Sequence, residues 1–272
     1  MTLRRTHIFI LILSLLILVP TDAAARKKNR NGNKSPNTER TQEPDALANR
    51  SRPERPVTAA VQARGGQHRG NVNQKYKEGI DVSHYQGRID WKRVGEGSRI
   101  SYVYIKATEG SSYVDDTYRY NLQGAKAAGL SVGSYHFYRP NVSPEEQLAN
   151  IRQNILPDEQ DLVPIIDIEH RGNVSEEKFI ADLTTLLQGV EKLFGRKPLL
   201  YSYQNFYNRH FTGRFRQYEW MIAKYQSEPP ILTDGRDFVM WQYTSKGSMP
   251  GINGHVDRSC LMDHYQLSVV AM

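Results

Sequence analysis

Eight short segments rich in β-branched and aromatic residues recur beyond residue 76 of this chain, and helical patterns lie between the early ones. Such segments are typical of β-strands, and strands that alternate with helices are typical of a parallel sheet. Eight is also the number of strands that closes a barrel with a filled interior. The eight segments span residues 79–83, 100–108, 131–138, 162–169, 198–203, 219–225, 238–244 and 255–262.

Three of the connections carry clear helical patterns. Residues 115–130 place apolar side chains at helical spacing, and residues 143–156 open with Ser143 as N-cap and Glu146 three positions on, a capping box. Residues 175–195 repeat this signal, but after the fifth strand only short helical pieces remain. A regular β/α barrel takes about 250 residues, and a barrel that lacks its later helices fits the shorter span available here.

The first 25 residues carry the three parts of a secretory signal peptide. Arg4 and Arg5 precede an apolar run over residues 8–19, which is followed by Pro20 and a patch of alanines. A membrane span needs about 20 apolar residues, and this run is shorter. We therefore expect a cleaved signal peptide, no stable membrane span, and a secreted or periplasmic protein of the cell envelope. An uncleaved anchor is the alternative.

Residues 26–75 contain almost no large apolar side chains and are rich in Asn, Arg, Pro, Gln and Gly. Such a segment cannot bury enough surface to offset the entropy of ordering, so we expect a disordered basic linker before a catalytic barrel at 76–272. The linker holds 12 Lys/Arg against 4 Asp/Glu, within a chain of net charge +7. Secretion argues against nucleic acid as its partner. Weak electrostatic contact with anionic envelope polymers and a solubilising spacer are the two interpretations.

Acidic residues stand at the ends of predicted strands. Asp167 and Glu169 close the apolar segment 162–169, while Asp81 lies late in the first strand and Asp257 in the last. Side chains two apart on a strand face the same way, roughly 6–7 Å apart, and the carboxyl ends of barrel strands build active sites. Alone, the Asp167–Glu169 pair is equally typical of a solvated strand end. The acids on the other strands, including Glu109 directly after the second, favour a site.

Seven motifs of the chain, taken in order, resemble those of one known family. They are GIDVSHYQGRIDW (79–91), IKATEG (105–110), GSYHFYRP (133–140), PIIDIE (164–169), LLYSY (199–203), WMIAKY (220–225) and MWQYTS (240–245). Together they resemble the glycoside hydrolase family 25 lysozymes, which are N-acetylmuramidases, over essentially all of residues 78–262. The resemblance implies a shortened TIM-like β/α barrel with eight strands and about five helices.

The resemblance also implies a reaction and roles for the acids. The reaction is hydrolysis of the β-1,4 bond between N-acetylmuramic acid and N-acetylglucosamine in the glycan strands of peptidoglycan. Glu169 would be the general acid/base, and Asp167 would orient and polarise the acetamido group of the substrate. Asp81 and Asp257 would line the same site. The family often continues its last motif as V-D-x-N, whereas Arg258 and Ser259 follow Asp257 here.

Aromatic side chains near the predicted mouth are candidates for binding sugar. Tyr135, Phe137, Tyr203 and Trp241 stand at positions that we expect to face inward, although aromatic residues of a small barrel also serve as core filling. Neither a Cys/His cluster nor an HxxxH or HxH spacing occurs in the sequence. We therefore expect no metal ion and no cofactor.

Two other functions share part of this pattern. A chitinase-like barrel also ends a strand in D-x-E, but its longer signature D-x-x-D-x-D-x-E would need acids where Leu162 and Ile165 stand. A non-catalytic module that binds the cell wall would be favoured if Asp167 or Glu169 were an amide or an apolar residue. Both are acids, so hydrolysis is the stronger interpretation.

Overall fold

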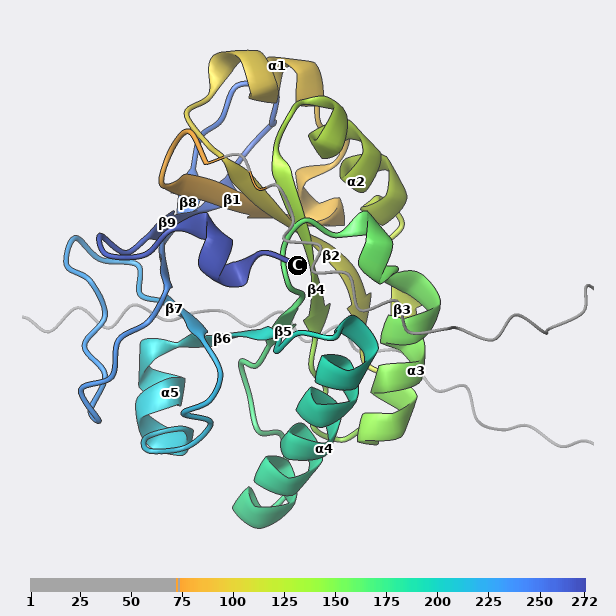
Figure 1. Ribbon diagram of the computed structural model, residues 1–272, viewed down its shortest axis with the longest axis vertical. Coiled ribbons are helices and arrows are strands. Elements are labelled where there is room, and N and C mark those ends of the chain that lie inside the picture. The colour runs from red at the N-terminus through yellow and green to blue at the C-terminus, as the bar shows by residue number, and fades with distance from the viewer. Residues whose placement is uncertain (1–71, 73) are drawn as a thin grey trace, which may run out of the picture. The chain divides into compact units, whose positions relative to one another are not determined.

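The computed structural model describes residues 72 and 74–272, drawn in colour in Figure 1. The predicted signal peptide 1–25 lies outside the described residues, and so does the predicted linker 26–75 except for residues 72, 74 and 75. Gln74 and Lys75 already contact the folded part, because the Gln74 side-chain oxygen accepts a hydrogen bond from the Leu267 N–H and the Lys75 N–H donates to the Ser101 hydroxyl.

Eight strands close into a barrel, as the sequence predicts, because β1 pairs with both β2 and β9. A ninth, two-residue strand, β3 (Tyr113–Val114), forms a hairpin on the outer end of β2. The barrel strands are β1 (Glu78–Val82), β2 (Tyr102–Glu109), β4 (Ser131–Phe137), β5 (Ile165–Asp167), β6 (Leu199–Tyr203), β7 (Trp220–Ala223), β8 (Met240–Gly247) and β9 (Val256–Leu261).

The last strand departs from the parallel sheet that strand–helix alternation predicts. From β1 to β8 the neighbouring strands of the barrel itself are parallel, but β9 runs antiparallel to both β8 and β1. A loop without a helix joins β8 to β9, and parallel neighbours need a longer crossover. The amino end of β9 therefore lies at the same edge of the barrel as the carboxyl ends of the other strands. This direction brings Asp257 opposite Asp81 in the register of β9 and β1.

Five α-helices pack outside the sheet, the number that the family resemblance implies. Ser143 accepts a hydrogen bond from the Glu146 N–H at 3.3 Å and so caps α3, as predicted, and Ser175 caps α4 in the same way. The helices are α1 (Trp91–Gly97), α2 (Tyr118–Ala127), α3 (Pro144–Asn154), α4 (Glu176–Phe194) and α5 (Gln204–His210). The described residues also form three short 3₁₀ helices: η1 (His84–Gln86), η2 (Pro157–Glu159) and η3 (Leu267–Val270).

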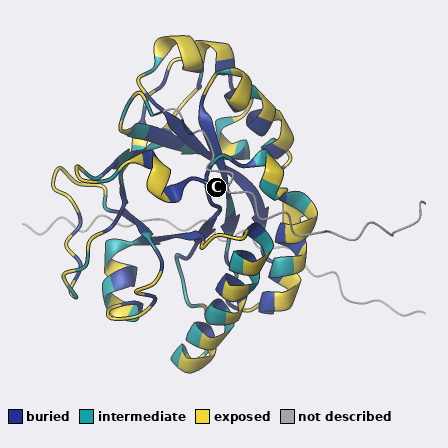
Figure 2. Cartoon of the chain, viewed as in Figure 1, coloured by how far each residue is buried: buried dark blue, intermediate teal, exposed yellow. Residues whose placement is uncertain are grey.

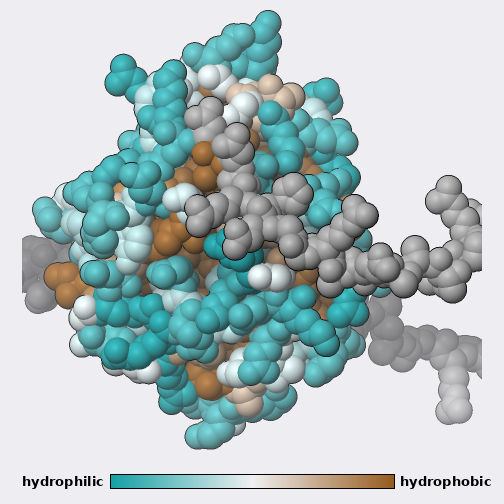
Figure 3. Space-filling model, viewed as in Figure 1, coloured by the Kyte–Doolittle hydropathy of each residue, from teal (hydrophilic) through white to brown (hydrophobic). Residues whose placement is uncertain are grey.

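Two apolar layers hold the barrel together. Successive side chains of a strand point to opposite faces, so Tyr102 and Tyr104 of β2 enter the barrel interior, while Val103 and Ile105 pack under the helices. Most residues of the barrel strands are buried and the helices expose their outer sides, whereas both residues of β3 are exposed (Figure 2). Accordingly, the face drawn in Figure 3 is mostly hydrophilic. In the described part of the chain, no helix is long and apolar enough to cross a membrane.

The C-terminal segment closes one end of the barrel. η3 places Leu267 and Val270 in the interior apolar layer, and the Val163 N–H donates to the Val270 carbonyl at 2.8 Å. Val163 precedes β5, so this contact lies at the amino ends of the parallel strands. The mouth of the barrel is consequently at their carboxyl ends, where the acids of the sequence motifs stand.

Candidate active site

A cavity of about 210 Å³ lies at the mouth of the barrel. Side chains from most of the barrel strands line it, and among them are the four acids that the sequence predicts together: Asp81, Asp167, Glu169 and Asp257. The charges of neighbouring acids add to burial in raising the pKa of Asp81, Asp167 and Glu169, because an ionised neighbour disfavours a second negative charge. Their protons are therefore shared by the group.

Asp167 and Glu169 reach the cavity from β5 and the residues after it. Asp167 is in register with Phe137 of β4 and Tyr201 of β6, is 7% exposed, and has a buried Oδ1 with no hydrogen-bond partner among the described residues. Burial and then the charge of Glu169 raise the pKa of Asp167 well above its ordinary value. Burial also raises the pKa of Glu169, with Asp257 adding to it and the Tyr203 hydroxyl opposing it. Glu169 is thus a carboxyl that can hold a proton at higher pH than a surface glutamate.

Asp81 and Asp257 face the cavity from the opposite side. They are register partners on β1 and β9, and burial followed by the charge of Asp257 raises the pKa of Asp81 well above its ordinary value. Burial raises the pKa of Asp257 to about 6. Asp81 Oδ1 accepts a hydrogen bond from Gln242 Nε2 at 2.9 Å, while its buried Oδ2 has no partner in the described part of the chain.

Gln242 of β8 links Asp81 to two tyrosines. The hydroxyls of Tyr201 and Tyr225 donate to Gln242 Oε1 at 2.8 and 2.7 Å, which turns the amide nitrogen of Gln242 toward Asp81. Gln242 is 2% exposed, so this relay fixes the orientation of Asp81 in a site with little competition from water. Sequence reasoning missed the relay, although Gln242 and Tyr225 lie in two of the seven motifs.

The group of acids around the cavity matches the groups that cleavage of a glycosidic bond requires. A glycosidic bond is cleaved by a carboxylic acid that protonates the leaving oxygen and a second group that stabilises the positive charge developing on the sugar. No group of three or more His, Cys, Asp or Glu side chains within residues 72 and 74–272 is arranged to hold a metal ion.

Comparison with known proteins places this site in a family. The family model of glycosyl hydrolases family 25 matches residues 80–252. The chain belongs to glycosyl hydrolases family 25. The matched range includes Asp81, Asp167 and Glu169, whereas Asp257 lies just beyond it, in the strand whose motif departs from the family pattern.

Relatives of known sequence or structure match about two thirds or more of this family 25 chain. An uncharacterized protein of Escherichia coli K12, YegX, is 38% identical over 183 residues, which are 66% of this chain and 67% of that protein. Lysozyme M1 of Streptomyces globisporus is 30% identical over 196 residues, which are 67% of this chain and 66% of that protein. A family 25 glycosyl hydrolase from Bacillus anthracis has a solved structure with a TM-score of 0.67 and 28% identity, covering 76% of this chain and 100% of that one.

The predicted aromatic residues divide between the two faces of the sheet. Tyr135, Phe137 and Tyr203 line the cavity of the family 25 barrel. The prediction that Trp241 faces inward is wrong: its ring packs against the apolar layer outside the sheet, and its indole N–H donates to the Lys224 carbonyl at 2.9 Å. Its neighbour Gln242 points inward instead, because alternate side chains take opposite faces.

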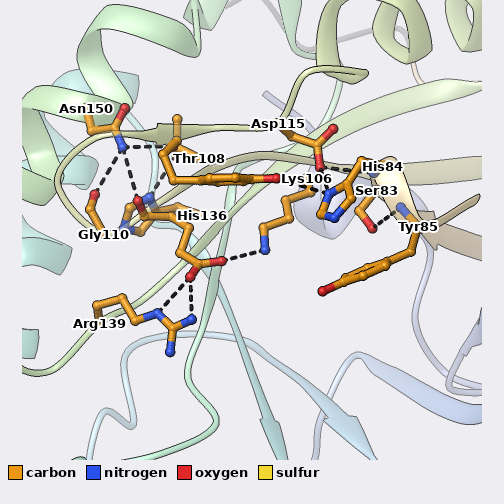
Figure 4. A network of polar contacts seen from close by, with 12 residues as sticks. Ser83, His84, Tyr85, Lys106, Thr108, Gly110, Asp115, His136, Arg139 and Asn150 are labelled. Carbon is orange, nitrogen blue, oxygen red and sulfur yellow. Dashed lines mark hydrogen bonds and ion pairs between the residues drawn. The ribbon is translucent and has the colours of Figure 1, made fainter. Parts of the chain in front are cut away.

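The turn after β1 adds an exposed aromatic residue to the rim. Tyr85 lines the cavity and is 81% exposed, and it projects from η1. The buried carboxylate of Asp115 fixes this turn, because its Oδ2 accepts from the His84 backbone N–H at 3.0 Å and lies 2.8 Å from His84 Nδ1 (Figure 4). Tyr85 lies in the first motif of the resemblance, but sequence reasoning did not identify it as a site residue.

Glu109 lies beside the cavity without lining it. Its Oε2 is 2.6 Å from Lys106 Nζ, and its Oε1 accepts from Arg139 Nε at 2.8 Å (Figure 4). Partial burial alone would raise the pKa of Glu109, but its hydrogen bonds with Lys106 and Arg139 outweigh burial and leave the pKa below its ordinary value. Glu109 is therefore an ionised carboxylate between two cations, and Lys106, which sequence reasoning missed, is the residue of this group that reaches the cavity.

Proposed function

We propose that this protein is a secreted lysozyme that hydrolyses the β-1,4 bond between N-acetylmuramic acid and N-acetylglucosamine in peptidoglycan. The observation that carries the proposal is the gathering of Asp81, Asp167, Glu169 and Asp257 around one cavity at the barrel mouth, in a chain of family 25. Peptidoglycan hydrolysis as a general activity agrees with relatives such as the autolytic lysozyme of Clostridium acetobutylicum, 32% identical over 180 residues.

In this proposal Glu169 is the general acid and base. Its raised pKa keeps a proton available for the leaving glycosidic oxygen, and general acid catalysis of this kind contributes typically 10²–10⁴-fold. After the bond breaks, the carboxylate takes a proton from the incoming water. Tyr203, whose hydroxyl lies beside Glu169, would help to orient the carboxyl group.

Asp167 assists the acetamido group of the muramyl unit. Its buried Oδ1 has no partner among the described residues and is free to accept a hydrogen bond from the acetamide N–H. That bond would hold the acetamide oxygen against the anomeric carbon as positive charge develops there. The protonated form of Glu169 is favoured by burial and by the charge of Asp257, which both raise its pKa.

Asp81 and Asp257 supply the electrostatic field of the site in this mechanism. The Gln242 relay orients Asp81, and Asp257 stands opposite it across the β1–β9 pair. Tyr135, Phe137 and Tyr203 offer ring faces to the sugar, since aromatic faces pack against the apolar faces of sugar rings. Export through the predicted signal peptide 1–25 would bring the enzyme to its polymer, and the basic linker 26–75 would serve as spacer or as a weak contact with anionic envelope polymers.

Clearing of purified cell-wall suspensions tests this function, with chitin as the control polymer. The purified protein should lower the turbidity of peptidoglycan and leave chitin intact. Cleavage of chitin alone would support a chitinase-like enzyme. Binding to walls without any release of soluble fragments would support a non-catalytic wall-binding module.

A further inference from the structure

One wall of the cavity carries a positive charge, whereas the other charged residues that line the cavity are acids. Among the described residues that line the cavity, Lys106 is the only lysine or arginine, against four acids. The Lys106 side chain is 10% exposed and rises from β2, in register with Tyr135 of β4. A lysine ammonium group is seldom buried to this extent unless it is paired with an acid, so the groups around Lys106 must compensate its charge.

Pairing with Glu109 neutralises only part of the positive charge of Lys106. Glu109 is shared with Arg139, whose guanidinium holds the other carboxylate oxygen. Two cations on one carboxylate leave the group formed by Lys106, Glu109 and Arg139 with a net charge of +1. Lys106 Nζ makes one hydrogen bond to Glu109, while an ammonium group has three N–H donors.

The surroundings of the two cations hold them in place. Lys106 Nζ lies 5.2 Å from the centre of the Phe137 ring and 5.3 Å from that of Tyr113, both at cation–π range. Arg139 lies 4.7 Å from the Phe137 ring centre, and its Nη1 is 3.2 Å from His170 Nε2. Burial, followed by the charge of Arg139, lowers the pKa of His170, so this imidazole is neutral and can accept from the guanidinium.

We propose that Lys106 and Arg139, held by their shared partner Glu109, recognise a carboxylate of the muramyl unit of the substrate. This inference rests on the proposed function and names the feature of the substrate that the site reads. A polymer that carries carboxylates is repelled by the four acids of the cavity unless a cation faces it. A neutral polymer such as chitin gains nothing from that cation, so the pair selects for muramyl units. In this assignment Lys106 and Arg139 bind substrate, and Glu109 is a positioning residue.

The carboxylate has two sources in peptidoglycan. A glycan strand stripped of peptides carries the free lactyl carboxylate on each muramyl unit, whereas a peptide-bearing strand blocks that group and presents carboxylates of the stem peptide. Both offer the same ligand chemistry to Lys106 and Arg139. Four soluble substrates separate them: peptide-free strands with the lactyl group free or methyl-esterified, and peptide-bearing strands with all carboxylates of the stem peptide free or amidated.

Initial rates of the wild-type protein on these four substrates give the first test. A hydrogen-bonded charge pair at a partly screened site is worth about tenfold in kcat/KM. We expect the free acid of at least one pair of substrates to be cleaved about tenfold better than its neutral counterpart. Equal rates within both pairs would overturn the inference. Failure to cleave any of the four would instead refute the proposed function itself.

Variants give the second test and assign the effect to residues. Lys106→Gln and Arg139→Gln should each reduce the preference for the free acid, by lowering kcat/KM more on the free acid than on its neutral counterpart. Each variant is compared at its own pH optimum, because Lys106 also lowers the pKa of Asp167. Arg119→Gln is the matched control, since Arg119 pairs with Glu159 on the surface outside the cavity and should keep the full preference. Equal losses on acidic and neutral substrates in both variants would show a merely structural role.

Discussion

Asp257→Asn should stabilise the folded protein at alkaline pH and leave its stability unchanged near pH 4. Burial raises the pKa of Asp257 from its ordinary 3.8 to about 6, so the folded state binds its proton more tightly than the unfolded state. The wild-type protein therefore has its full stability below pH 3.8 and loses part of it as pH rises through 6. Asparagine resembles the neutral acid at every pH and avoids this loss.

The expected gain in the free energy of unfolding follows from the pKa shift of Asp257. Two pKa units correspond to about 3 kcal/mol at about 1.36 kcal/mol per unit, and solvent reaches part of the Asp257 side chain, which reduces the expected gain to about 1–2 kcal/mol. At about 2–4 °C per kcal/mol for a domain of this size, the melting temperature at pH 8 should rise by about 2–8 °C.

Thermal unfolding at pH 4 and pH 8, followed by circular dichroism, measures this difference. Asp263→Asn is the control, because Asp263 is exposed and its hydrogen bond with Lys77 lowers its pKa, so its removal should bring no gain at pH 8. A rise in melting temperature of the same size at both pH values, or a fall at pH 8, would refute the argument that Asp257 carries an unfavourable buried charge.

Three further predictions concern the site and the linker. Glu169→Gln should lower kcat by 10²–10⁴-fold without changing the melting curve at pH 5, because the amide cannot donate the proton; a wild-type rate in a turbidity assay would remove Glu169 from its role. Asp167→Asn should reduce cleavage more than Asp81→Asn on acetylated peptidoglycan, and wild-type enzyme should cleave de-N-acetylated peptidoglycan poorly, since both effects depend on the acetamido group; equal wild-type rates on the two polymers would argue against substrate assistance. Deletion of residues 26–71 should leave activity on soluble muropeptides intact, because the described contacts with the barrel begin at Val72, which packs against the interior apolar layer; a deletion variant that fails to fold would contradict this boundary.

The barrel could be predicted from the sequence because its signals are local. Strand composition, the N-cap of Ser143 and the count of strands each depend on neighbouring residues, and together they determine a closed sheet with helices outside. The acids could be placed at one end for the same reason: Asp81, Asp167 and Glu169 stand late in strands whose carboxyl ends meet at one edge.

Features set by contacts between distant segments could not be predicted this way. The antiparallel course of β9 depends on the loop before it, and only that course explains why Asp257, near the start of its strand, reaches the cavity. The outward face of Trp241 follows from the register of β8, which composition does not give. The Gln242 relay joins β1, β6, β8 and the segment after β7 through side chains. The sharing of Glu109 by Lys106 and Arg139 likewise appears only when the strands are closed into a barrel.

The reducing-end sugar of the reaction product tests the central claim most directly. Purified peptidoglycan is digested with the wild-type protein, the products are reduced with borohydride, and the reduced sugars are identified by mass spectrometry. Hydrolysis between N-acetylmuramic acid and N-acetylglucosamine leaves muramic acid at the new reducing end, so we predict N-acetylmuramicitol. Reduced N-acetylglucosamine as the new end, or no new reducing end at all, would contradict the assignment of this barrel as a lysozyme.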